Sequence, residues 1–77
     1  MEHDQAMQAV HAGRLVEAVV MPAEEADGWH LWLAASDGAR EAYTSHGGTA
    51  TVFHTLDHAT EVARELGFES IRVEETF

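Results

Sequence analysis

The chain has 77 residues and contains no cysteine and no lysine. Four arginines and fourteen acidic residues give it a formal net charge of −10. This length allows one small domain, and the missing cysteines exclude disulfide bonds and thiolate metal ligands. The scattered arginines and the excess of acid argue against direct binding to nucleic acid or to an anionic membrane, whereas a basic protein partner is permitted.

Residues 1–13 are predicted to form either a tail or a short helix, and residues 14–77 a single small domain. The stretch 2–12 favours helix, but its apolar face is thin, and Gly13 would end the helix. An isolated helix of this length is marginal in water, so it would need a surface on which to dock.

Two strongly apolar strands are predicted next, over residues 14–21 and 29–36. The first is rich in β-branched residues and stops at Pro22. Successive side chains of a strand point to opposite faces, and one face of each strand is expected to meet the core. The residues expected on the core face are Val16, Ala18, Val20, Trp29, Leu31, Leu33 and Ala35. Those expected on the opposite face are Leu15, Glu17, Val19, Met21, His30, Trp32 and Ala34.

Further strands are predicted over residues 40–45 and 49–53. Glycine-containing turns separate the strands, as in an antiparallel meander. The turns are Asp27-Gly28, Asp37-Gly38, which is a two-residue hairpin signal, and Gly47-Gly48.

A helix with clear start and stop signals follows the meander. Thr55 is the expected N-cap, and Gly67 suits the left-handed position after the last turn. A final strand over residues 70–75 gives the order β-β-β-β-α-β, a two-layer α+β fold with an antiparallel meander, one helix and a last strand. The expected core comprises Leu31, Leu33, Phe53, Leu56, Val62, Leu66, Ile71 and Val73.

Residues 29–74 contain a glycine-marked hairpin that leads to a Phe, a Thr-Leu-Asp helix start and a closing strand. The residues of this pattern are Gly47, Phe53, Thr55, Leu56, Asp57, Ala59, Leu66, Gly67 and Val73. With them the stretch resembles small uncharacterised bacterial proteins encoded on plasmids and integrative conjugative elements. The resemblance implies the fold rather than an activity. Such proteins often carry basic residues around the hairpin, where this chain has His46 and Thr51.

Three residues near the helix start leave two interpretations open. His54 and His58 are four residues apart and Glu61 follows, so the three could form a metal- or small-ligand-binding site. However, His54 precedes the expected N-cap, and the same residues suit an ordinary helix start. The chain has no G-x-S-x-G elbow and no phosphate-binding loop, so we expect neither enzymatic activity nor a cofactor.

The second face of the two apolar strands is the candidate interaction surface. An exposed apolar patch that contains an aromatic residue is typical of an interface. We therefore predict a homodimer joined through Leu15, Val19, Met21 and Trp32; the alternative is that the N-terminal segment folds over this face. The N-terminus has no cationic start followed by an apolar run, and no stretch is long enough to span a bilayer. The expected location is the cytoplasm.

Overall fold

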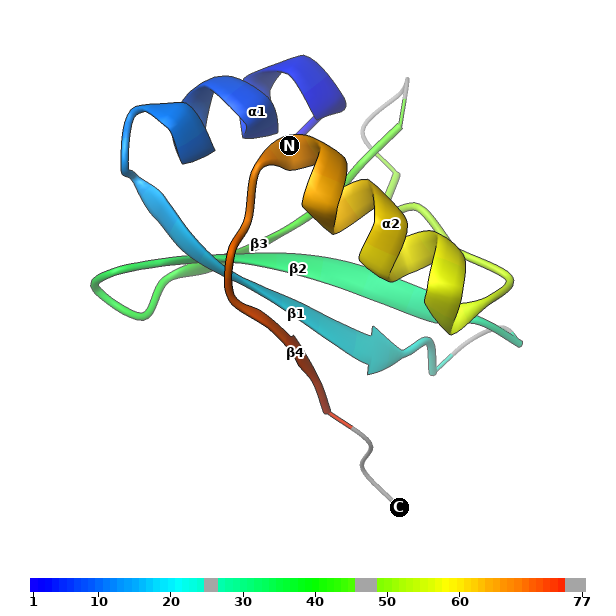
Figure 1. The fold of residues 1–77 in the computed structure, drawn as a ribbon. Coiled ribbons are helices and arrows are strands. Elements are labelled where there is room, and N and C mark those ends of the chain that lie inside the picture. The colour runs from blue at the N-terminus through cyan, green and yellow to red at the C-terminus, as the bar shows by residue number, and fades with distance from the viewer. Residues whose placement is uncertain (25–26, 46–48, 75–77) are drawn as a thin grey trace.

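The computed structural model describes residues 1–24, 27–45 and 49–74. In these residues two helices and four strands form an α+β fold, as predicted. One helix precedes the strands and the other precedes the last strand (Figure 1). The elements are α1 (His3–His11), β1 (Leu15–Pro22), β2 (Trp29–Ala35), β3 (Arg40–Ala42), α2 (Leu56–Leu66) and β4 (Ile71–Val73).

The four strands form one sheet in the order β3-β2-β1-β4. β1, β2 and β3 pair antiparallel, whereas β4 pairs parallel with β1. The hairpin between β2 and β3 turns at the predicted Asp37-Gly38, where Gly38 has a φ of 90° and its N–H donates to the carbonyl of Ala35. Because parallel strands need a long crossover connection, α2 lies in the segment that returns the chain to β1.

The predicted strand over residues 49–53 is reduced to two isolated bridges, Thr44 with Ala50 and Trp29 with Phe53. Phe53 exchanges two backbone hydrogen bonds of 2.8 Å with Trp29, whereas the N–H of Thr51 donates to the carbonyl of Tyr43. The segment thus crosses from the end of β3 to the start of β2, and it cannot build a continuous ladder with either. The predicted Gly47-Gly48 turn and residue 75 of the last predicted strand lie outside the described residues.

Both predicted signals at the ends of α2 are present. The Thr55 hydroxyl accepts a hydrogen bond from the N–H of His58 at 3.1 Å. At the other end, Gly67 has a φ of 103°. The N–H groups of Gly67 and Phe68 donate to the carbonyls of Arg64 and Ala63, which closes the helix in a Schellman pattern.

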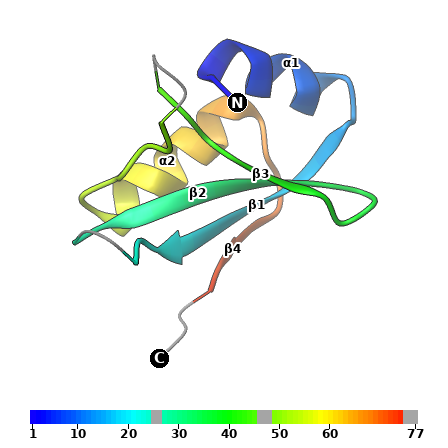
Figure 2. The same ribbon diagram turned by 180° about the vertical axis from the view of Figure 1, so that it is seen from behind.

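Both helices cover the same face of the sheet, and both views show this arrangement (Figures 1 and 2). The N-terminal amino group of Met1 donates to the carbonyl of Ala42 at 2.8 Å, which ties the start of α1 to β3. Alanines let the two helices approach closely, because they add little bulk at the contact. Those on α1 are Ala6 and Ala9, those on α2 are Ala59 and Ala63, and all are buried.

A β-bulge in β1 corrects two predictions about side-chain direction. The register passes from Leu15 opposite Ala35 to Glu17 opposite Ala34, so Val16 is an extra residue. The bulge reverses the alternation at the start of the strand. Leu15 joins the core under the helices, and Val16, which was expected in the core, is 48% exposed.

The rest of the predicted core is largely present. Leu31, Leu33, Phe53 and Leu66 are buried, and Leu66 is completely so, which confirms the predicted register of α2. Leu56, Val62 and Ile71 are partly buried and pack against the core. Val73 is the exception at 37% exposure, because it lies on the outermost strand, where one side has no neighbouring strand among the described residues.

Candidate functional site

The candidate site is the face of the sheet opposite the two helices, called here the open face. No helix or strand of residues 1–24, 27–45 and 49–74 covers it (Figures 1 and 2). Partners in neighbouring strands point to the same face, so the register gives one row across all four strands. That row is Ala42, Trp32, Val19 and Arg72, and it is flanked by Arg40, Ala34 and Glu17 on one side and by Met21 and His30 on the other.

The centre of the open face is apolar, yet it is not bare. Val19 has no exposed surface and Ala34 is 8% exposed, although no helix lies above them. Long side chains from the outer strands have apolar stems that can cover such residues while their charged ends stay in water. We attribute the burial of Val19 to its neighbours Trp32 and Arg72 in the row and to the charged side chains described next.

A chain of ion pairs crosses the open face. The guanidinium of Arg72 lies 3.4 Å from the carboxylate of Glu17 and 2.9 Å from that of Glu74. Glu74 also lies 3.5 Å from Arg40. Arg40 begins β3 and Glu74 follows β4, so this series of ion pairs connects the two outer strands across β1 and β2.

The open face is close to electrically neutral on a strongly acidic protein. Its two arginines, Arg40 and Arg72, balance Glu17 and Glu74. Glu24 adds one negative charge at the end of this face, and most of the net charge of −10 lies elsewhere on the chain. Another acidic surface should therefore meet little electrostatic repulsion at this face.

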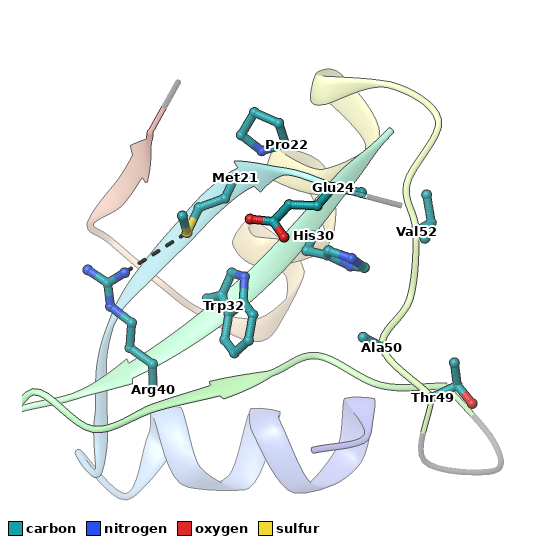
Figure 3. A pocket seen from close by; sticks show the side chains of 10 residues that line it. Met21, Pro22, Glu24, His30, Trp32, Arg40, Thr49, Ala50 and Val52 are labelled. Carbon is teal, nitrogen blue, oxygen red and sulfur yellow. Dashed lines mark hydrogen bonds between the residues drawn. The ribbon is translucent and has the colours of Figure 1, made fainter. Parts of the chain in front are cut away.

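One end of the open face is hollowed next to Trp32 (Figure 3). This Trp32 hollow has a volume of about 750 Å³. Residues from β1, β2 and β3 form its floor and one wall, and the segment that follows residue 48 forms the other wall (Figure 3). Its lining comprises Met21, Pro22, Ala23, Glu24, His30, Trp32, Arg40, Thr49, Ala50 and Val52.

A hydrogen bond to the backbone fixes the ring of His30 at this hollow. Its Nδ1 lies 3.1 Å from the carbonyl oxygen of Thr51. A carbonyl oxygen can only accept, so Nδ1 must carry the hydrogen. In the neutral ring Nε2 is then an acceptor, and it has no hydrogen-bond partner among the described residues.

Three of the four predicted interface residues lie on the open face. Val19, Met21 and Trp32 are there, as the strand alternation indicated. The prediction that Leu15 lies on the open face is wrong, because the bulge directs its side chain into the core. The alternative in which the N-terminal segment covers Trp32 is also wrong, since α1 packs with α2 on the opposite face (Figure 2).

The structure does not assemble the alternative metal site. His54, His58 and Glu61 are all exposed. The ring of His58 meets Phe53 edge-on at a centroid distance of 5.1 Å, so this histidine packs on the core rim. Across the described residues, no three histidine, aspartate or glutamate side chains form a group that could hold a metal ion.

Sequence reasoning missed the ion pairs and the hollow. Arg72 stands between Ile71 and Val73 in an alternating strand, which indicated that its side chain leaves the core. Nothing local indicated that it meets Glu17, because that contact depends on the parallel pairing of β4 with β1. The hollow likewise needs the segment after β3 to return beside β2.

Comparison of the chain with models of known protein families, with curated proteins and with solved structures gives no match. The resemblance to plasmid-encoded bacterial proteins therefore stays a prediction. Neither described helix has the length and apolar character needed to cross a membrane.

Proposed function

We propose that this protein is a non-enzymatic interaction protein of the cytoplasm that self-associates through the open face of its sheet. The observation that carries the proposal is that Trp32 and Met21 stay partly exposed on a sheet face that no described helix covers. On that face two arginines pair with two glutamates, although the protein is strongly acidic.

The driving force would be burial of apolar side chains. Trp32 and Met21 are only partly buried in the single chain, and complete burial of a large apolar side chain contributes about 1.5–3 kcal/mol. A two-fold interface uses each residue twice, which increases the gain before the entropy cost of association is subtracted. We therefore expect a dimer at micromolar concentrations.

The balanced charges of the open face favour contact with a second copy there. Two copies that each carry a net charge of −10 repel one another, and salt screens that repulsion. Contact through the open face brings balanced arginines and glutamates together, so Arg40 and Arg72 can pair with carboxylates of either copy. A basic protein partner, which the net charge also permits, would be drawn to the acidic surfaces and not to this one.

The test is a pair of charge reversals that change the total charge equally. Arg72→Glu makes the open face acidic, whereas Arg64→Glu places the same change on α2, behind the sheet. Both side chains belong to exposed residues, and an exposed ion pair contributes only about 0–1 kcal/mol, so both variants should fold. We expect sedimentation equilibrium to find a dimer for the wild type and for Arg64→Glu, and a monomer for Arg72→Glu.

Two results would contradict the proposal. The first is a wild type that sediments as a monomer at every concentration and salt level. The second is equal dissociation of both variants, which would show that total charge and not the open face controls association.

A further inference from the structure

The Trp32 hollow has the size and lining of a small-molecule site. Its volume of about 750 Å³ lies within the range of ligand pockets, about 300–1,000 Å³. Six of the ten residues that line it are apolar, and they include the indole of Trp32 and the thioether of Met21. Aromatic rings prefer offset or edge-to-face contacts with another ring, so this floor suits a flat aromatic occupant.

The polar groups restrict the occupant further. His30 lines the hollow, and its bond to the Thr51 carbonyl leaves Nε2 as an acceptor. A ligand that buries this nitrogen without giving it a hydrogen bond would lose affinity, because an unpaired buried acceptor is costly. The occupant should therefore carry an N–H or O–H group.

The charges around the hollow disfavour an anion. The lining includes one arginine, Arg40, and its guanidinium is already paired with Glu74. Glu24 is exposed, and Figure 3 draws its carboxylate between Met21 and His30. The whole chain carries a net charge of −10. Neither the hollow nor the field of the protein attracts a negative ligand.

We propose that the Trp32 hollow binds a small, neutral, planar aromatic molecule that carries a single hydrogen-bond donor, the chemistry of an indole or a phenol. The ring lies against Trp32 and Met21, and its donor bonds to Nε2 of His30. This binding needs no second copy of the chain and goes beyond the proposed self-association. Because Met21 and Trp32 belong to both surfaces, such a ligand should compete with the second copy if the dimer covers the hollow.

Indole and N-methylindole provide a matched pair of probes, since they have similar rings and only indole has an N–H donor. Each is titrated into the ¹⁵N-labelled protein and followed by amide chemical shifts, in the wild type and in Arg72→Glu. Arg72 does not line the hollow, so the site should be intact in that variant whether or not the dimer exists. We expect shifts at Met21, His30 and Trp32, and an affinity for indole about five-fold or more above that for N-methylindole, as one hydrogen bond implies.

Two substitutions assign the donor contact. His30→Ala should abolish the preference for indole, whereas His54→Ala, an exposed histidine outside the hollow, should keep it. The same spectra report whether each variant is folded. The inference is overturned if indole shifts no resonance of the hollow up to its solubility limit in either protein, or if both probes bind equally to the folded wild type and Arg72→Glu. Retention of the preference in folded His30→Ala would also overturn it.

Discussion

Replacement of Leu66 by alanine is the sharpest test of how this small fold is held together. Leu66 ends α2, has no exposed surface, and is among the largest fully buried side chains of the described residues. Leucine-to-alanine changes at such sites cost about 2–5 kcal/mol, because transfer energy is lost and a cavity remains. A 77-residue chain has a total stability of about 4–12 kcal/mol, so Leu66→Ala should remove a large part of it.

The measurement is urea unfolding followed by circular dichroism. We expect the free energy of unfolding to fall by about 2–5 kcal/mol and the melting temperature to fall by at least about 8 °C. Glu65→Ala is the matched control, since Glu65 is the exposed neighbour on the same helical turn and should change stability by no more than about 0.5 kcal/mol. Leucine and alanine have similar helix propensities, so the difference reports packing. If Leu66→Ala were no worse than Glu65→Ala, the assigned packing of α2 would be refuted.

Three further predictions follow from individual residues. Gly67→Ala should cost about 1–2 kcal/mol in urea unfolding, because alanine resists the left-handed conformation that Gly67 adopts at a φ of 103°; an unchanged midpoint would contradict this. Burial chiefly, with Glu65 and Asp4, raises the pKa of Tyr43 above its usual 10.0. The native state thus holds the Tyr43 proton more tightly than the unfolded chain does. The contribution of protonated Tyr43 to the free energy of unfolding is complete below about pH 10, and it is lost as the pH rises through the pKa of Tyr43 in the native state. The chain has no lysine or cysteine and one tyrosine, so alkaline unfolding curves of the wild type should lose stability more steeply than those of Tyr43→Phe; equal slopes would oppose the argument. Zinc at modest excess should leave the melting temperature unchanged, because only a ligand that binds the native state raises it; a rise that His58→Ala abolishes would show that the histidines do bind metal.

Short-range signals made the helix α2 and the β2–β3 turn predictable from the sequence. The Thr55 cap acts on the amide of His58, three residues away, and Gly67 closes the same helix through carbonyls within its last turn. Asp37-Gly38 turns the chain with bonds among its immediate neighbours. Interactions of this range depend on local residue types, so they hold whatever surrounds them.

The bulge at Val16 shows where local reasoning fails. Strict alternation placed Leu15 on the open face, but one extra residue in β1 moves it under the helices. No glycine or other turn residue at positions 15–17 marks the irregularity. Burial of the Leu15 side chain in the core is favourable, and that burial exists only once the helices have packed on the sheet.

The candidate site combines both kinds of information. The sequence by itself determined that the chain is acidic, that it lacks cysteine chemistry, and that β1 and β2 carry apolar residues on both faces. Tertiary structure decided which of those faces is covered, because α1 could dock on either side of the sheet and packs against the alanines of α2. It also brought Arg40 to Glu74 and the Thr51 carbonyl to His30. These partners lie far apart in the chain, and they meet only after the strand order and register place them side by side, which no local pattern of residues encodes.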